Sequence, residues 1–483
     1  MGSLKKGQDY TGLVIKNEYP NKGLVLCEGE KIAVKGVLEG QKVNFRLTKV
    51  RNGRLEGKLL KVEEKSTLEV QEPFCPHFEF CGGCTFQTLS YDGLLKMKAD
   101  EVKSILDNAI SSFSGSDPDN TGSEGLKDDG NQELYEFMGI APSPQEKGYR
   151  NKMEFSFGDS SKDGELTLGL HKAGSFYDIL QITDCKITNE DYNAIVKFTV
   201  ELCRSYNLTY CHKMSHVGYL RHLLIRRAAT TGEILVNLVT TSQWSDDDEF
   251  LQRFKDGLLN LNLNGSIVGV LHSINDDPAD AVKADRIEIL KGKDFFFEEI
   301  LGQIFKITTF SFFQTNSFGA EVLYGIVRDF VGDTRDKAVF DLYSGTGTIA
   351  QILAPVAKSV TGVEIVPEAV ESAKMNAALN GLSNCEFICG DVLKVLDGLE
   401  VRPDIIVLDP PREGIHPKAL SKIISYRVET IVYVSCKPTS LARDLEAFLK
   451  EGYKLVKVKC CDMFPWTVHV ETVALLSRRS VHE

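Results

Sequence analysis

Residues 431–438 read Ile-Val-Tyr-Val-Ser-Cys-Lys-Pro, a β-branched and aromatic run that predicts a buried strand ending at Cys436. In an open α/β sheet the carboxyl ends of the parallel strands line the ligand crevice, so a cysteine at that edge faces a ligand. The neighbouring Lys437 favours the thiolate, which is the nucleophilic form. A half-buried structural cysteine is the alternative. Four other segments that end at the same sheet edge favour the catalytic interpretation.

The sequence after residue 310 alternates strands, Gly-containing loops and helices. The four strand ends that precede the Cys436 strand carry a Gly-x-Gly turn or a carboxylate: Gly345 with Gly347, Glu364, Asp391 and Asp409. Residues 453–462 and 469–478 predict two further strands at the edge of the sheet. This order predicts an α/β fold with a doubly wound, Rossmann-like domain over residues 306–483.

Composition restricts the class of protein. A chain of 483 residues exceeds one core and predicts roughly two to four domains. No apolar run reaches the about 18 residues of a membrane span, and the N-terminus lacks the apolar segment of a secretory signal. Twelve cysteines in such a chain indicate metal binding or catalysis in a reducing compartment. We therefore expect a cytoplasmic protein, with an organellar location left open.

Residues 1–66 predict a small OB-like β-barrel, because five short alternating stretches are separated by Gly or Asn. Residues 1–65 carry fourteen Lys and Arg against eight Asp and Glu, although the whole chain has a net charge of −12. Salt screens the field of a charge beyond about 10 Å, so an RNA backbone interacts with the local excess of positive charge and not with the net charge of the whole chain. The barrel is therefore predicted to bind RNA. Any small barrel with a solvated basic face is the alternative.

A metal motif follows the barrel, with Cys75, Cys81 and Cys84 separated by five and then two residues. The fourth ligand must come from elsewhere, and Cys185 is a better candidate than His77. Thiolates hold either tetrahedral zinc or an iron–sulfur cluster. Zinc sites more often pair two Cys-x2-Cys knuckles, so the asymmetric spacing favours a cluster.

Residues 67–305 predict a central α+β domain with an antiparallel sheet and helices near 191–206 and 247–260. Residues 111–133 predict an acidic disordered insertion. Four basic residues on the predicted strands are either phosphate contacts or part of a solvated face: Arg150, Lys152, Arg221 and Arg226.

The Gly-x-Gly turn and Glu364, nineteen positions beyond Gly345, suit the ribose of either NAD or S-adenosylmethionine. A dinucleotide enzyme needs a third loop glycine, and Thr348 occupies that region. Asp409-Pro410-Pro411 instead matches the edge at which methyltransferases hold an acceptor base. Methyl transfer is therefore favoured over hydride transfer.

The cysteine indicates which atom is methylated. An exocyclic amine needs no protein nucleophile, whereas C5 of a pyrimidine becomes nucleophilic only after a thiolate adds at C6. A base must then remove the C5 proton, and Glu471 on the final strand is the best-placed carboxylate. A solvated strand carboxylate is the alternative role for Glu471.

Four segments together resemble the RNA uracil-5-methyltransferase family (TrmA/RumA-like): Asp409-Pro-Pro-Arg412-x-Gly414, Ser435-Cys436-Lys437-Pro438, Phe312-Phe313-Gln314-Thr315-Asn316 and His469-Val470-Glu471. The barrel resembles the TRAM domain of that family. The set Cys75, Cys81, Cys84 and Cys185 resembles the four-iron, four-sulfur (4Fe-4S) cluster of its ribosomal RNA members.

The resemblance implies that Cys436 is the nucleophile and Glu471 the base. It also implies five contacts to S-adenosylmethionine: Gln314, Tyr343, Glu364, Asp391 and Asp409. Thr348 departs from the family, whose ribosomal RNA members often place Asn there. The expected substrate is an unpaired uridine, because the target base must leave its stack.

We expect ribosomal RNA as partner, with transfer RNA left open, and a monomer. Two other functions remain: an N-methyltransferase acting on a purine base, suggested by Asp409-Pro-Pro, and an RNA-binding scaffold with an inactive transferase domain.

Overall fold

The computed structural model describes residues 4–478 except 52, 115–133, 163, 245–246, 280–282 and 399–401. The chain forms two compact units. Unit 1 comprises residues 1–74, 84–142 and 410–483, and unit 2 comprises residues 75–83 and 143–409. Residues 115–133 of the predicted acidic insertion lie outside the described residues. None of the helices in the described ranges is long and apolar enough to cross a bilayer.

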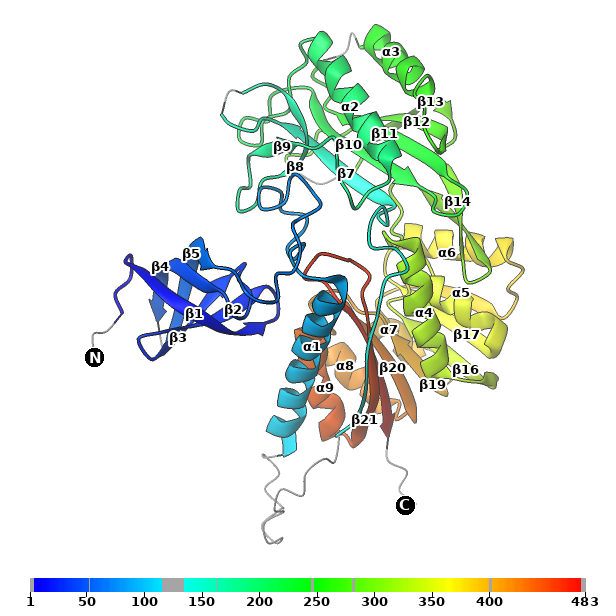
Figure 1. Cartoon of the computed structure of the whole chain (residues 1–483). Helices are drawn as coiled ribbons and strands as arrows, with labels where there is room; N and C mark the ends of the chain where they lie inside the picture. Colours follow the sequence, from blue (N-terminus) through cyan, green and yellow to red (C-terminus); the bar gives the residue numbers. More distant parts are fainter. Residues whose placement is uncertain are drawn as a thin grey trace, which may run out of the picture. The chain divides into compact units, whose positions relative to one another are not determined.

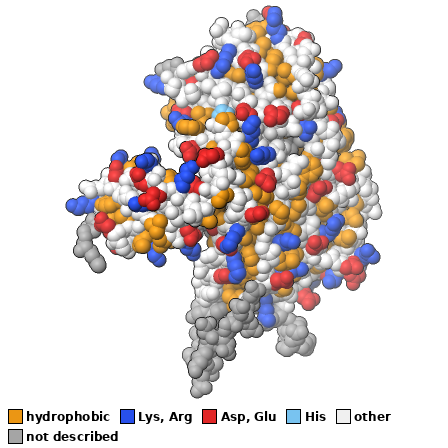
Figure 2. Space-filling model, in the orientation of Figure 1, with side chains coloured by type: hydrophobic (Ala, Val, Ile, Leu, Met, Phe, Trp, Pro, Cys, Tyr) orange, Lys and Arg blue, Asp and Glu red, His pale blue; other side chains and the backbone are white. Residues whose placement is uncertain are grey.

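Unit 1 begins with a closed barrel in the order β1-β2-β3-β5-β4, which confirms the predicted small β-barrel. Its strands are β1 (Asp9–Glu18), β2 (Lys22–Cys27), β3 (Glu30–Lys35), β4 (Lys42–Arg51) and β5 (Arg54–Glu64). Alternating apolar side chains point inward, so Val25, Ile32 and Phe45 are completely buried. Figure 2 shows Lys and Arg next to Asp and Glu on the barrel surface.

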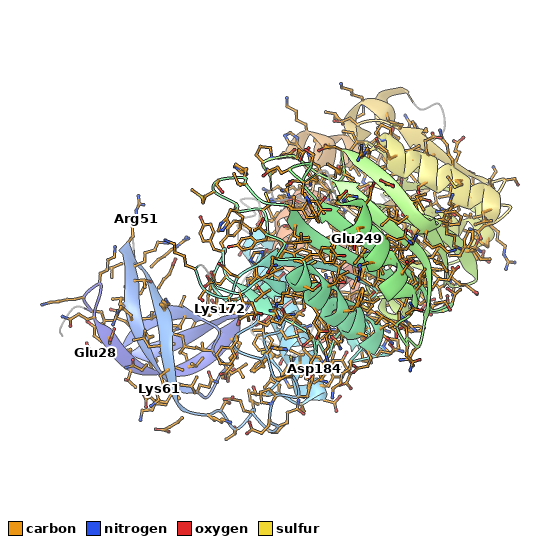
Figure 3. The ribbon with its side chains drawn as sticks, turned by 90° about the horizontal axis from the view of Figure 1, so that it is seen from above. Glu28, Arg51, Lys61, Lys172, Asp184 and Glu249 are labelled. Atoms are coloured by element: carbon orange, nitrogen blue, oxygen red, sulfur yellow. The ribbon has the colours of Figure 1, made fainter. Side chains whose placement is uncertain are left out.

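Several basic side chains of the barrel form ion pairs. Arg46 contacts Asp9 at 2.6 Å, and Lys49 contacts Glu56 at 2.7 Å. Arg51, at the end of β4, projects away from the barrel in Figure 3. These pairs occupy some of the basic side chains, whereas the net positive excess of the barrel stays the same because the paired acids are already counted in it.

The rest of unit 1 contains α1 (Tyr91–Ser114), β6 (Glu136–Ala141), α8 (Pro417–Ser425), β20 (Thr430–Ser435), α9 (Pro438–Lys450), β21 (Tyr453–Cys461) and β22 (Glu471–Arg478). The strand order is β20-β22-β21-β6. Helix α1 packs on α9, as Figure 1 shows. The predicted pair of edge strands is therefore wrong in one respect: β22 lies between β20 and β21, and β6 pairs with β21. The apolar, almost entirely buried β22 needs a neighbour on each side.

Unit 2 contains four parallel strands in the order β18-β17-β16-β19. They are β16 (Thr334–Leu342), β17 (Ala357–Glu364), β18 (Cys385–Cys389) and β19 (Ile405–Leu408). The helices are α4 (Ser317–Val331), α5 (Thr348–Leu353), α6 (Pro367–Leu379) and α7 (Val392–Gly398). The chain reverses direction of winding between β16 and β19, where open α/β sheets bind ligands. The predicted Rossmann-like topology is confirmed for these strands.

Unit 2 also contains a seven-stranded sheet in the order β13-β12-β11-β10-β7-β8-β9. Its strands are β7 (Lys152–Gly158), β8 (Thr167–His171), β9 (Ile179–Gln181), β10 (Leu220–Arg227), β11 (Glu233–Thr240), β12 (Ser266–Ile274) and β13 (Arg286–Gly292). Helices α2 (Glu190–Ser205) and α3 (Asp248–Leu259) contribute to its core, and the hairpin β14 (Phe295–Ile300) and β15 (Gln303–Thr308) follows. The predicted sheet is antiparallel except for β11 and β12, which α3 joins as a parallel crossover.

Two predicted phosphate contacts of this sheet are structural instead. Arg221 is 8% exposed and donates to the carbonyl oxygens of Asn275 and Asp277, each at 2.7 Å. Arg226 is 2% exposed and donates to the carbonyl oxygen of Ser311. Both guanidinium groups are buried and donate to backbone carbonyls, so they are not available to bind RNA, although Arg226 Nε has no partner among the described residues.

Candidate functional site: a glycine loop and a cysteine–glutamate pair

The loop after β16 is anchored to β17 by its backbone. The N–H groups of Tyr343 and Ser344 both donate to the carbonyl oxygen of Val363 at 3.0 Å. Gly347 has φ +72°, and a Cβ there would lie 2.4 Å from the Phe387 ring. Gly345 has φ +54°, and a Cβ there would meet no described heavy atom within 4 Å. The two glycines therefore serve different purposes: Gly347 permits close packing, and Gly345 keeps the loop open to a ligand.

Glu364, at the end of β17, holds this loop in place. Its Oε2 accepts from the N–H of Gly345 at 3.0 Å, and its Oε1 accepts from the N–H groups of Ile365 and Val366 at 2.9 Å. Asp391 is exposed, and its Oδ1 accepts from the N–H of Leu393 at 2.8 Å, at the beginning of α7. Both carboxylates thus fix the backbone at the carboxyl ends of their strands.

Two carboxyl groups, one buried and one half-buried, lie at the ends of the neighbouring strands β16 and β19: Asp341 and Asp409. Asp341 is completely buried, and its Oδ2 accepts from the N–H of Ala350 at 2.9 Å. Burial, with a contribution from Asp409, raises the pKa of Asp341 well above its usual value. Burial raises the pKa of Asp409 to about 7. A cation bound beside them would stabilise their ionised forms.

Two polar atoms near the loop have no hydrogen-bond partner among the described residues: Asp341 Oδ1 and Ser344 Oγ. Buried polar atoms normally have a partner, so a ligand with polar groups fits this position. S-adenosylmethionine carries a sulfonium, an ammonium and ribose hydroxyls, and the carboxyl groups suit all three. The sequence did not lead us to predict Asp341 as a site residue. Its position, one residue before the end of the strand that precedes the Gly-x-Gly turn, is a signal that could have identified it.

The segment before α4 supplies both a helix cap and a candidate ligand contact. Asn316 is buried, and its Oδ1 accepts from the N–H of Gly319 at 2.9 Å, so it caps the helix. Gln314 is half-buried, and its carbonyl oxygen accepts from Asn151 Nδ2 at 3.0 Å. Phe312 is 68% exposed.

Thr348 is buried at the beginning of α5, with its Oγ1 3.5 Å from Thr346 Oγ1.

In unit 1, the pairing of β20 with β22 brings the predicted nucleophile and base together. Ser435 pairs with Thr472 in antiparallel register. The same register, extended by one residue beyond Ser435, places Cys436 opposite Glu471. The Cβ atoms of opposed residues in antiparallel strands are about 5 Å apart. Glu471 is 6% exposed, and Cys436 is partly exposed. The arrangement presents a thiol to solvent beside a buried carboxyl group.

The backbone on either side of Cys436 is held by serine hydroxyls. Ser435 Oγ donates to the carbonyl oxygen of Lys437 at 3.0 Å and accepts from its N–H at 3.2 Å. Ser440 Oγ, in the first turn of α9, donates to the carbonyl oxygen of Arg412 at 2.9 Å. These bonds fix the thiol relative to α9 and to the segment that follows Asp409-Pro-Pro.

Buried groups hold the aromatic turn that precedes Glu471. Lys98 Nζ, on α1, donates to the carbonyl oxygen of Phe464 at 3.2 Å. Trp466 is 2% exposed and contacts the rings of Phe74 and Tyr91, with centroids 5.2 and 5.5 Å away. These contacts position the strand that carries Glu471.

A residue of the barrel also lies near the pair. Tyr19 follows β1, and burial raises its pKa to about 12. The charges that act on its phenol include Arg412, Cys436 and Glu471. Tyr19 lies in a turn far from Cys436 and Glu471 in the sequence. No local pattern links it to them, so the sequence does not predict its place near the pair.

The cysteines of the predicted metal motif interact in part. Burial raises the pKa of the Cys81 thiol, and Cys185 and Cys75 raise it further. Burial also raises the pKa of Cys185, whereas hydrogen bonds from Ile187 and Thr188 lower it. Within the described ranges, no group of three or more Cys, His, Asp or Glu side chains converges closely enough to hold a metal ion. Thiols are the ligand type that iron–sulfur clusters and zinc use, but the described side chains do not form a closed set of ligands.

The parallel strands and glycine loop are typical of nucleotide-binding α/β domains, a class that includes the S-adenosylmethionine-dependent methyltransferases. The family model "tRNA (Uracil-5-)-methyltransferase" matches residues 138–479. An RNA methyltransferase of Caldanaerobacter subterraneus subsp. tengcongensis is 45% identical over 98% of this chain and 100% of its own length. One from Clostridium tetani is 45% identical over 99% of each chain.

A solved structure resembles the whole chain. The Pyrococcus abyssi tRNA (uracil-54, C5)-methyltransferase in complex with S-adenosyl-L-homocysteine aligns with a TM-score of 0.71 and 25% identity, over 96% of this chain and 100% of that one. The chain therefore belongs to the tRNA (uracil-5-)-methyltransferase family and is an S-adenosylmethionine-dependent RNA (uracil-5-)-methyltransferase.

Proposed function

We propose that this enzyme methylates C5 of an unpaired uridine in RNA through a covalent bond between Cys436 Sγ and C6 of the base, with Glu471 removing the C5 proton. The antiparallel register of β20 and β22, which sets Cys436 opposite Glu471, supports this assignment most directly. A nucleophile and a proton acceptor on facing strands can act on neighbouring carbons of one ring.

The proposed reaction consists of addition, methylation and elimination. Cys436 Sγ adds to C6, and the electrons of the C5–C6 double bond move onto C5 and O4. C5 forms a bond to the methyl group of S-adenosylmethionine as the bond between that methyl group and the sulfonium breaks, which leaves S-adenosylhomocysteine. Glu471 then accepts the C5 proton, the C5–C6 double bond re-forms, and the Cys436–C6 bond breaks to return the thiolate. Lys437, next to Cys436, favours that thiolate.

We propose that unit 2 binds the cofactor through Gln314, Tyr343, Glu364, Asp391 and Asp409. The buried Asp341 and the unpaired Ser344 Oγ support a polar, cationic ligand at the end of β16. Because Glu364 already accepts from Gly345 and two further backbone amides, a contact to ribose would use the remaining lone pair of Oε2.

We also propose a 4Fe-4S cluster held by Cys75, Cys81, Cys84 and Cys185. The charges of Cys75 and Cys185 raise the pKa of Cys81, and Cys75 raises the pKa of Cys185, which supports part of this set. A metal-free apoprotein reconstituted with iron and sulfide should develop a broad visible absorption that Cys185→Ser loses. Stoichiometric zinc in the purified protein, without iron, would overturn the cluster.

The proposed partner is ribosomal RNA, because the cysteine set resembles that of the ribosomal RNA members. Transfer RNA is the second candidate, favoured by the names of the matching family and of the Pyrococcus relative. Mapping 5-methyluridine in both RNA classes from cells that lack the protein separates them. Loss from one class identifies the substrate.

The decisive experiment concerns Cys436. Cys436→Ala should abolish methylation while S-adenosylmethionine binding, measured by calorimetry, stays largely intact. RNA that contains 5-fluorouridine should form a covalent adduct with the wild-type protein, because fluorine cannot leave as a proton does. Methylation by Cys436→Ala, or methylation without an adduct, would favour an N-methyltransferase. An absence of S-adenosylmethionine binding by the wild type would favour a scaffold.

A further inference from the structure

Two exposed aromatic side chains lie on the loop that joins β8 to β9. Phe176 is 67% exposed and Tyr177 is 58% exposed. Their rings meet edge to face with centroids 5.8 Å apart, and the His171 ring stacks on Phe176 at 6.0 Å with an interplanar angle of 17°. Neighbouring aromatic faces left in contact with water are typical of a binding surface.

A second loop, between α2 and β10, packs against the first. Lys213 Nζ lies 4.4 Å from the Phe176 ring centroid and donates to the carbonyl oxygen of Phe176 at 3.2 Å. Met214 and Val217 on this loop are 79% and 63% exposed. We call residues 171–177 and 211–218 together the aromatic platform. It combines apolar faces with a cation held beside them.

The charge of the aromatic platform differs from that of the whole chain. Residues 171–177 and 211–218 contain two lysines and three histidines but no Asp or Glu, whereas the chain has a net charge of −12. Lys172 is exposed, and Figure 3 shows it at the surface of unit 2. A basic surface with exposed aromatic rings suits a ligand that has both flat bases and phosphates.

A cavity of about 390 Å³ adjoins the platform. It is lined by Asp159, Gly164, Leu166, Leu208, Thr209, Tyr210, His212, Ser215, Val217 and Gly218. The rings of Tyr210 and His212 lie 4.4 Å apart, and Tyr210 Oη donates to Asp159 Oδ2 at 2.9 Å. Its volume is within the range of small-molecule pockets, and its aromatic wall suits a single extruded base.

We propose that the aromatic platform binds unpaired RNA bases away from the uridine that is methylated, with Phe176 and Tyr177 stacking on bases and Lys172 and Lys213 contacting phosphates. This inference rests on the proposed function, and it assigns unit 2 a role in choosing the RNA. Single-stranded RNA is favoured over duplex because only unstacked bases expose their faces to aromatic rings. It is favoured over a protein partner because exposed aromatic rings beside two lysines suit flat bases joined by phosphates.

The full-length protein is titrated into a short fluorescein-labelled single-stranded RNA of mixed sequence, and binding is followed by anisotropy. Phe176→Ala and Tyr177→Ala should each weaken binding about tenfold. Phe176→Trp should retain binding. Ile289→Ala, which removes a side chain of 48% exposure on β13, is the matched control and should bind normally. Lys213→Gln should reduce the dependence on salt by about one phosphate contact.

Thermal unfolding of each variant shows whether it is folded, and the retained binding of Phe176→Trp separates stacking from a loss of structure. Unchanged anisotropy for both alanine variants would overturn the proposal. So would equal competition by duplex RNA, or variants that alter self-association instead of RNA binding. The 5-fluorouridine adduct at saturating protein reports the proposed function independently. If the wild type forms no adduct, the proposed function is wrong. If the adduct forms but the two alanine variants bind RNA as the wild type does, only the proposed role of the aromatic platform is wrong.

Discussion

Lys98 Nζ donates a hydrogen bond to Asp462 Oδ1 across 2.6 Å, and the two side chains are only 2% and 0% exposed. Tyr91 Oη donates to the other oxygen, Asp462 Oδ2, at 3.0 Å. This buried pair joins α1 to the turn that precedes Glu471. A helix from the first third of the chain thereby supports the strand that carries the proposed base.

Lys98→Met should destabilise the protein by about 3–5 kcal/mol, because it leaves the Asp462 carboxylate buried without its partner. Urea denaturation measures this change. Lys98→Met combined with Asp462→Leu should recover much of the loss, since no buried charge remains. A single variant that costs less than about 1 kcal/mol would show that the pair does not hold the turn.

Gly347→Ala and Gly345→Ala form a matched pair. Both residues have a positive φ, which costs a side chain about 1–2 kcal/mol. Only at Gly347 would the new Cβ meet the Phe387 ring, adding about 1–3 kcal/mol of overpacking. We expect Gly347→Ala to lose more stability. Gly345→Ala should mainly lower the affinity for S-adenosylmethionine, measured by calorimetry. Equal effects of both variants on stability would contradict this division.

The affinity for S-adenosylmethionine should rise between about pH 6 and pH 8. Burial raises the pKa of Asp409 to about 7, and a cation beside this carboxyl group favours its ionised form. Binding therefore releases a proton at a pH below about 7, and affinity increases by at most about tenfold per pH unit. Calorimetry in buffers of different ionisation enthalpy detects the proton. Asp409→Asn should bind more weakly and lose most of the pH dependence.

Glu471→Gln should trap the covalent protein–RNA adduct, because the thiolate cannot leave until the C5 proton is removed. A denaturing gel shows the adduct as a shifted band after incubation with S-adenosylmethionine and RNA. Glu101→Gln is a control carboxylate of the same unit and should leave no trapped band. Normal turnover by Glu471→Gln would assign the base to another group.

Glu101 should make stability depend on pH. Burial raises its pKa to about 7 from 4.5, so the folded state holds the proton more tightly than the unfolded state. Its favourable contribution is fully present below about pH 4.5 and is lost as the pH rises through 7. At pH 8 Glu101→Gln should be more stable than the wild type by at most about 3 kcal/mol, and the difference should vanish near pH 4.5. Denaturation at both pH values measures this.

Local patterns in the sequence predicted the elements of unit 2 with good accuracy. The strand ends at Gly345, Glu364 and Asp409 lie where periodicity and turn residues indicated, because β-branched runs and Gly-rich turns restrict the backbone locally. The helices expected at 191–206 and 247–260 are α2 and α3, displaced by about one residue. The strand ends and the helices depend on interactions between residues that are near one another in the sequence, so a single sequence is enough to predict them.

Residues distant in the chain come together for reasons that no local pattern contains. The insertion of β22 between β20 and β21 depends on pairing across the sheet, and this pairing brings Ser435, next to Cys436, opposite Thr472, next to Glu471. Arg226 looked like a phosphate contact until its burial against Ser311 was visible.

Residue types and their spacing along the chain are enough to predict the type of fold, the proposed nucleophile and the family resemblance. Which charges are buried, which glycine is packed and which aromatic side chains meet solvent is visible only in the folded chain. Burial and long-range pairing arise from the packing of the whole chain, and their free energies depend on neighbours that lie far away in sequence.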